Sequence, residues 1–512
     1  MARTKSKPKI EAPATTAQQL GSLIKSCRDI MRKDKGLNGD LDRLPMLTWV
    51  MFLKFLDDLE QMREQKAALK GEKYRPGIEK PYRWRDWAAD EKGMTGDNLL
   101  RFISQDEAIR PDGKRGDGLF AYLRGLHGAN GGDRRDVIAT VFKGVANRMQ
   151  SGYLLRDILN KVNSIHFSSS EEMHTLSLLY ESMLKEMRDA AGDSGEFYTP
   201  RPVIRFMVKA TDPRLGETIL DPACGTGGFL VETFQHLEPQ CKTVEDRRTL
   251  QTKSVFGSEP KSLPYMLAQM NLLLHGLEAP QISPLNSLNQ PLREIGEKDR
   301  VDVILTNPPF GGEEERGILS NFPEDKQTAE TALLFLQLIM RKLRRQPKPG
   351  RTAVVTPNGT LFGDGVCARI KEELLKEFNL HTIVRLPNGV FAPYTGIATN
   401  LLFFDRLGPT KEIWYYEQPL PGGRKTYTKT QPMRFEEFEA CLTWWKRREE
   451  NDRAWRVPAE KIVQSNYNLD IKNPSAKEDF AHMPPEQLAE SILQKEQKIA
   501  EIMGSIRNLI AK

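Results

Sequence analysis

From Gly216 onward the sequence alternates short β-branched or apolar runs with stretches of helical periodicity, and few folds accommodate such a pattern. The runs cover residues 218–220, 254–257, 301–306, 352–356, 382–386 and 400–404. Strands that alternate with helices predict a parallel, doubly wound α/β sheet that is covered on both faces. We expect its last strand to end near Phe404.

The rest of the chain is predicted to be mostly helical. Apolar residues at helical spacing occupy 17–165 and, as a single helix, 170–190. We therefore divide the 512 residues into a frayed basic tail at 1–16, an α-helical domain at 17–165, an α/β domain at 166–410, a connecting region at 411–475 and a C-terminal helix at 476–512.

The terminal helix carries a short coiled-coil seam. Its apolar positions alternate at spacings of four and three, and Lys495 interrupts them; they are Leu488, Ile492, Ile499, Ile502, Ile506 and Leu509. Such a seam is typical either of a helix that docks on another subunit or of an amphipathic helix that packs on its own domain.

The charge of the chain indicates its partners less clearly than its apolar pattern indicates its fold. The chain has 75 Lys and Arg against 69 Asp and Glu, and a net charge of +6 permits a nucleic-acid partner without requiring one. A basic cluster is more suggestive, although cations at the end of a helix also match the helix dipole. The cluster consists of Arg341, Lys342, Arg344, Arg345, Lys348 and Arg351.

Several classes of protein are disfavoured. The five cysteines show no C-x₂-C spacing, which argues against a zinc site or a disulfide framework, and we expect no metal. No apolar stretch approaches the length of a membrane span, and the N-terminus lacks the apolar run of a secretory signal. We expect a cytoplasmic protein with no membrane contact.

The first predicted strand leads directly into a glycine-rich turn and then a helix. Gly225, Gly227 and Gly228 let the backbone approach a ligand, and the following helix presents unpaired N–H groups. The turn suits a small cofactor that carries a carboxylate or a phosphate. Because no Lys-Ser/Thr pair follows the glycines, a P-loop is disfavoured.

Glu259 follows the second predicted strand. An acidic side chain at this position can accept hydrogen bonds from both hydroxyls of a ribose. A polar insertion at 238–253 explains why Glu259 lies farther from the glycines than in the dinucleotide fingerprint. The alternative is that Glu259 is only a neighbour of a helix N-cap.

The most informative motif is Asn307-Pro308-Pro309-Phe310, which ends a buried strand. The two prolines fix the backbone and cannot donate hydrogen bonds, so a carbonyl near Pro308 points into the cleft. That carbonyl and the Asn307 oxygen can together accept both hydrogens of one amino group, and Phe310 offers a face for stacking. The motif predicts a planar substrate that bears an –NH₂ group.

With these motifs, the chain resembles S-adenosylmethionine-dependent amino-methyltransferases, and more closely the modification (M) subunits of type I restriction-modification systems. Asp-Pro-Ala-Cys-Gly-Thr-Gly-Gly-Phe-Leu and Asn-Pro-Pro-Phe carry the resemblance. Residues 195–202, 386–391 with 394–396, and 466–469 extend it, and it covers nearly the whole chain from about residue 17. It implies a Rossmann-like methyltransferase domain at 166–410.

The resemblance also implies roles for individual residues. Asn307, Pro308, Pro309 and Phe310 would form the catalytic motif and hold the target base. The S-adenosylmethionine contacts would come from Glu196, Phe197, Tyr198, Thr199, Pro200, Arg201, Asp221, Gly225, Thr226, Gly227, Gly228, Phe229 and Glu259. Many relatives carry an acidic residue after the third strand for the cofactor's adenine, and here Asn286 occupies the matching stretch.

The implied reaction is methylation of adenine N6 in double-stranded DNA, on a base flipped out of the stack. Cytosine N4 methylation and protein glutamine N5 methylation are alternatives, whereas cytosine C5 methylation is disfavoured because no cysteine follows a proline. The region between Phe404 and the terminal helix is too short for a large DNA-reading domain. The resemblance implies a separate specificity (S) subunit with two M chains per S chain, and a restriction (R) subunit in the full complex.

Overall fold

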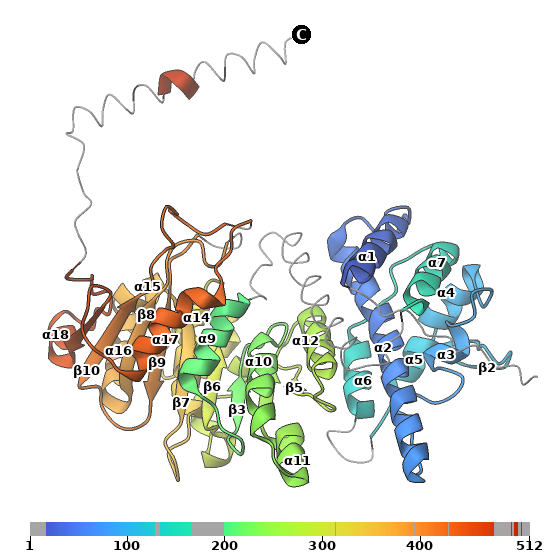
Figure 1. Cartoon of the computed structure of the whole chain (residues 1–512), viewed down its shortest axis with the longest axis horizontal. Helices are drawn as coiled ribbons and strands as arrows, with labels where there is room; N and C mark the ends of the chain where they lie inside the picture. The colour runs from blue at the N-terminus through green and yellow to red at the C-terminus, as the bar shows by residue number, and fades with distance from the viewer. Residues whose placement is uncertain are drawn as a thin grey trace, which may run out of the picture.

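The computed structural model describes residues 17–128, 134–165, 199–312, 314–392, 396–428 and 430–475, and a few positions beyond 490. In Figure 1 these residues form a helical N-terminal domain beside a larger α/β domain. The helix that we predicted at 170–190 lies outside the described residues, as does most of the predicted C-terminal helix.

Within its described residues, the N-terminal domain consists of seven helices and one short hairpin. The helices are α1 (Ala17–Met31), α2 (Asp40–Lys70), α3 (Trp84–Trp87), α4 (Gly96–Ser104), α5 (Leu119–Arg124), α6 (Arg134–Lys143) and α7 (Gly152–Asn163), and the hairpin pairs β1 (Glu107–Ile109) with β2 (Arg115–Asp117). Helix α2 crosses the centre, where Trp49, Phe52 and Phe55 are fully buried. The predicted helical N-terminal domain is confirmed.

A sheet of nine strands forms the core of the second domain. The strands are β3 (Ile219–Asp221), β4 (Val255–Ser258), β5 (Gln281–Ser283), β6 (Val303–Thr306), β7 (Arg351–Pro357), β8 (Asn379–Arg385), β9 (Thr399–Asp405), β10 (Glu412–Glu417) and β11 (Ala454–Pro458). Their spatial order is β11-β10-β8-β9-β7-β6-β3-β4-β5. All six predicted strands are present, within a few residues of the expected bounds.

Two expectations about this sheet were wrong. It is not wholly parallel, because β9 runs antiparallel to both β7 and β8, and β11 runs antiparallel to β10. The described residues between β8 and β9 contain no helix, and without a helical crossover the chain returns in the opposite direction. The sheet also does not end near Phe404, since β10 and β11 extend it within the region that we expected to be a connection.

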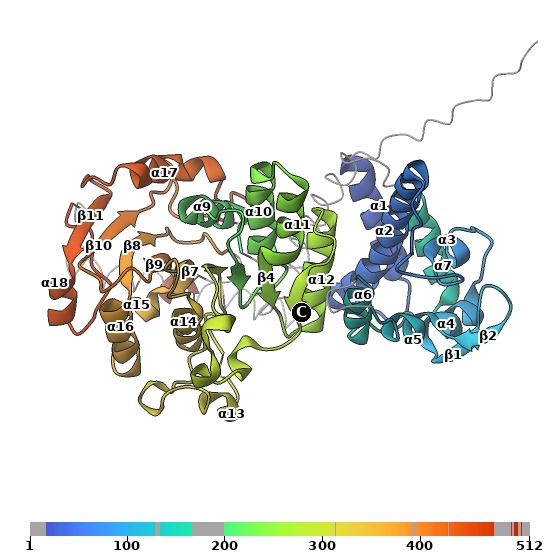
Figure 2. The ribbon, with the colours of Figure 1, turned by 90° about the horizontal axis from the view of Figure 1, so that it is seen from below.

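Helices cover both faces of the sheet, as expected of a doubly wound fold. On one face lie α9 (Arg201–Thr211), α10 (Gly228–Leu237), α12 (Ser262–Leu274) and α17 (Glu439–Lys446); on the other lie α14 (Thr331–Lys342) and α16 (Val366–Glu377), as Figure 2 shows. The remaining helices, at the edges and in loops, are α11 (Val244–Lys253), α13 (Arg316–Leu319), α15 (Asn358–Phe362) and α18 (Ala459–Gln464).

The two domains pack together through helices. Helices α2 and α6 contact α12, and Arg63 forms an ion pair with Glu278 at 3.2 Å. Residue Gly144 lies so close to Ser262 that an added Cβ would meet the serine Cβ at 2.4 Å. None of the helices within the described residues combines the length and the apolar character that a membrane crossing requires.

Candidate active site

The glycine turn follows β3 at the carboxyl end of the strand. Gly225 and Gly227 adopt positive φ angles of 52° and 77°, which favour glycine. A Cβ on Gly228 would lie 2.7 Å from Cδ1 of Ile204 on the neighbouring helix α9. The backbone of the turn thus adopts a conformation and a close packing that only glycine permits at these positions.

Glu259 closes the turn from the adjacent strand. Its Oε2 accepts a hydrogen bond from the backbone N–H of Gly225 at 3.1 Å, and its Oε1 accepts one from Lys261 at 2.8 Å. Burial raises the pKa of this carboxyl to about 7. The contact to Gly225 is a structural role that the motif did not reveal. The carboxylate keeps acceptor capacity for a ribose, because its two oxygens together offer about four lone-pair sites.

Asp221 connects the glycine turn to the strand that carries the Asn-Pro-Pro-Phe motif. Its Oδ1 accepts from the Thr306 hydroxyl at 2.6 Å and from the Ala223 N–H at 3.1 Å. Burial raises its pKa to about 7, and the Thr306 bond partly opposes the rise. Because Thr306 directly precedes Asn307, this bond sets the two motifs side by side.

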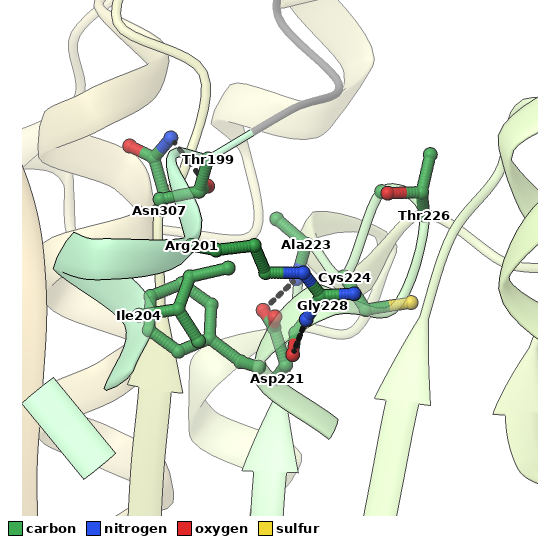
Figure 3. A pocket seen from close by; sticks show the side chains of 11 residues that line it. Thr199, Arg201, Ile204, Asp221, Ala223, Cys224, Thr226, Gly228 and Asn307 are labelled. Atoms are coloured by element: carbon green, nitrogen blue, oxygen red, sulfur yellow. Dashed lines mark hydrogen bonds between the residues drawn. The ribbon is translucent and has the colours of Figure 1, made fainter. Parts of the chain in front are cut away.

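Asn307 lies where the two motifs meet. Figure 3 shows its amide directed at Thr199, and Nδ2 donates to Thr199 Oγ1 at 3.0 Å. Its Oδ1 is buried and has no hydrogen-bond partner among the residues that the structure describes. An unpaired buried acceptor costs free energy, so the site is built to receive a donor at this oxygen.

These residues line one cleft between the glycine turn and the start of α9. The described residues around it are Thr199, Arg201, Ile204, Asp221, Ala223, Cys224, Gly225, Thr226, Gly228, Phe229 and Asn307 (Figure 3). Sequence reasoning gave no role to Ile204, Ala223 and Cys224. Ala223 and Cys224 stand within the glycine motif, whereas Ile204 lies on α9, where no motif marked it. Arg201 also donates to the Gly228 carbonyl at 2.9 Å.

Among the described residues, the predicted Pro200, Gly227, Glu259 and Asn286 are not part of this lining. Glu196, Phe197 and Tyr198 lie outside the described residues. The oxygen of Asn286 accepts from the Leu288 N–H at 3.0 Å and caps a short turn, while Nδ2 donates to Glu314 at 3.3 Å. The amide oxygen that we expected to face a cofactor is therefore already engaged within the chain.

The motif aromatic, Phe310, is half-buried beside the cleft. Its ring contacts that of Phe391 edge-on, with centroids 5.8 Å apart and planes at 71°. Phe391 ends the 386–391 segment that supported the family resemblance, and the structure thus brings two distant motifs into contact. Pro308 is buried, and Pro309 is partly exposed.

Comparison with known proteins gives consistent results. The N-6 DNA Methylase family profile matches residues 171–483, and the HsdM N-terminal domain profile matches 20–162. The chain is 49% identical to the type I restriction enzyme EcoEI methylase subunit of Escherichia coli, over 96% of this chain and 97% of the relative.

Two solved structures are also similar to this chain. A modification subunit of a type I restriction enzyme from Vibrio vulnificus has 71% identity and a TM-score of 0.86, covering 92% of this chain and 99% of that one. A chain from a study of complex assembly and conformational transition of the type I R-M system has 40% identity and a TM-score of 0.76. The match covers 97% of this chain and 99% of that one.

Proposed function

The chain belongs to the N-6 DNA methylase family, among the methylase subunits of type I restriction enzymes, and we propose that its cleft methylates N6 of an adenine flipped out of duplex DNA. Family membership gives the class of enzyme, a DNA methyltransferase specific for adenine. The proposal concerns how the residues of this chain perform that reaction.

The unpaired oxygen of Asn307 is the observation that carries the proposal. It is buried, and the contact of Nδ2 with Thr199 fixes the amide so that oxygen, not nitrogen, remains available. An adenine N6 group would supply the missing donor. With the carbonyl near Pro308, this oxygen would accept the N6 hydrogens and orient the nitrogen lone pair. Asn307 acts as an acceptor and not as a proton-removing base.

Base flipping follows from the geometry of DNA. The N6 atom of a stacked adenine cannot enter a cleft, so the base must leave the duplex at a cost of about a few kcal/mol. Phe310, partly exposed beside Asn307, offers the stacking surface that would offset part of this cost. Phe391 supports the Phe310 ring from its edge.

The residues around the glycine turn fit S-adenosylmethionine. The turn has no room for a Cβ at Gly228, and two carboxyls, Asp221 and Glu259, lie at the tips of β3 and β4. We assign Glu259 to the ribose hydroxyls and Thr199 and Arg201 to the methionine end, with Glu196–Tyr198 continuing that segment. When bound, the cofactor supplies an electrophilic methyl group on a sulfonium. Asn286 stays a candidate for the cofactor's adenine, because its amide oxygen accepts one hydrogen bond, from Leu288, and has two lone pairs.

We further propose that the chain acts in the cytoplasm within a complex containing a specificity subunit, two copies of this chain and a restriction subunit. One similar chain comes from a structure that addresses assembly of a type I R-M system. The coiled-coil seam at 485–512 is the segment that we assign to docking with the specificity subunit. Target-sequence readout would then lie on the partner.

The test compares Asn307→Ala with the unaltered chain, each purified with its specificity subunit. We expect transfer of labelled methyl groups to adenine in duplex DNA to fall by at least about a hundredfold, with S-adenosylmethionine affinity unchanged. Asn38→Ala is the matched control, because Asn38 is exposed in the N-terminal domain. Retained transfer in Asn307→Ala, or labelling of protein in place of DNA, would refute the proposal.

A further inference from the structure

A second hollow includes Arg406, which follows β9 beside the start of β7, whereas Asn307 follows the other end of the neighbouring strand β6. The hollow has a volume of about 610 Å³ and is bordered by the end of α14 and by the side of α16, which share one face of the sheet in Figure 2. Neither Asn307 nor any residue of the glycine turn is among the residues that line it. Five cations line it, and these are Arg293, Lys326, Arg341, Arg345 and Arg406.

The arginines of the basic cluster at 341–351 fall into two sets in the structure, those with a carboxylate partner and those that line the hollow. Arg344 pairs with Asp302 at 3.2 Å, and Arg351 pairs with Glu217 at 2.8 Å, so both hold the fold together. Arg341 and Arg345 instead face the hollow. Matching of the helix dipole therefore does not account for the whole cluster.

Four arginines of the hollow have no carboxylate within 4 Å among the described residues: Arg293, Arg341, Arg345 and Arg406. Arg341 donates to the Leu292 carbonyl at 2.9 Å, and Arg406 donates to the Met340 carbonyl at 3.3 Å. The Nε atom of Arg406 is buried without a hydrogen-bond partner. Lys326 alone among the five is neutralised, by Glu373 at 2.5 Å.

The arginines also repel one another. Burial lowers the pKa of Arg406 to about 10, and the charges of Arg345 and Arg300 lower it further. Burial together with Arg345 and Arg341 likewise lowers the pKa of Arg300. The charge of Glu377 partly opposes this effect on Arg406, but the cations of the hollow outnumber its carboxylates, and a bound anion would relieve their repulsion.

We propose that this hollow binds a compact phosphate anion, either pyrophosphate itself or the phosphate chain of a nucleotide. Guanidinium groups pair with phosphate oxygens through two parallel hydrogen bonds, and several arginines converge here. The volume falls within the range of small-ligand sites. Glu324, Glu373 and Glu377 also line the hollow, and their negative charge would confine a bound anion to the side of the arginines.

The test is calorimetric titration of pyrophosphate into the full chain at low ionic strength. Arg293→Ala/Arg345→Ala is the informative variant, because both side chains are exposed and their loss should leave the fold intact. Arg447→Ala/Lys461→Ala removes the same charge from exposed positions elsewhere. We expect at least an about tenfold loss of affinity in the first variant only. Absence of binding, or an equal loss in both variants, would overturn the proposal.

Competition identifies the source of the phosphate. Displacement of pyrophosphate by ATP but not by a short duplex assigns the hollow to a free polyphosphate, whereas displacement by the duplex assigns it to nucleic-acid backbone. A polyglutamate peptide that competes as well as ATP would overturn the phosphate assignment. Methylation by the Arg293→Ala/Arg345→Ala variant should remain at the level of the unaltered chain, because neither Asn307 nor any residue of the glycine turn lines the hollow.

Discussion

Replacement of Thr306 by valine tests how the glycine turn is held to the catalytic strand. The two side chains have nearly the same shape, and Thr306 is fully buried, so the change removes one hydroxyl without opening a cavity. That hydroxyl donates to Asp221 Oδ1 at 2.6 Å. The perturbation thus isolates one hydrogen bond to a buried carboxyl.

The size of the effect depends on the charge of Asp221. A hydrogen bond to a charged group contributes about 1.5–3 kcal/mol, and a neutral one about 0.5–1.5 kcal/mol. With the pKa of Asp221 at about 7, the carboxyl of the folded protein is ionised at high pH and protonated at low pH. The free energy of unfolding should therefore fall by about 2 kcal/mol at about pH 8.5, and by about 1 kcal/mol at about pH 5.

Thr352→Val is the matched control. Thr352 is also a buried threonine of the same sheet, and its hydroxyl donates to the backbone carbonyl of Ile304 at 2.8 Å. Because that carbonyl does not titrate, loss of this hydrogen bond should lower the free energy of unfolding by about 1 kcal/mol at both pH values. Urea denaturation of the three proteins at both pH values measures these differences. An equal, pH-independent loss in Thr306→Val and Thr352→Val would refute the assignment of a charged bond to Asp221.

Three further predictions concern the cofactor cleft and assembly. Gly228→Ala should destabilise the turn by about 1–3 kcal/mol and weaken S-adenosylmethionine binding, because the new Cβ meets Cδ1 of Ile204. The second substitution Ile204→Val removes that Cδ1 atom and should restore binding. If binding is not restored, the steric cause is wrong. Burial raises the pKa of Glu259 to about 7, so its ionised form, which accepts from the ribose, increases as pH rises through 7. Cofactor affinity measured by fluorescence should rise over that range and respond less in Glu259→Gln, whereas identical slopes would exclude this role. Deletion of 485–512 should weaken assembly with the specificity subunit on a sizing column, and an unchanged complex would assign docking to another surface.

Local patterns determined the elements of this protein and its principal motifs. The alternation of β-branched runs with helical stretches predicted six strands, and the glycines and Asn-Pro-Pro-Phe predicted a cleft before any fold was known. These signals are short in range, because a strand, a tight turn or a proline pair is fixed by neighbouring residues. The helical N-terminal domain was predictable for the same reason.

Pairings between distant segments were decided only by the tertiary structure. The insertion of β9 between β7 and β8, and the addition of β10 and β11 to the sheet, depend on pairings between strands that are distant in the sequence. The hydrogen bond from the Leu288 N–H to the oxygen of Asn286 also appeared only in the folded chain. The basic cluster separated into paired and unpaired arginines according to which carboxylates lay across the fold. Residues far apart in the chain bury the Asp221 carboxyl and the Asn307 side-chain oxygen. This burial raises the pKa of Asp221 and leaves the oxygen of Asn307 without a partner among the described residues.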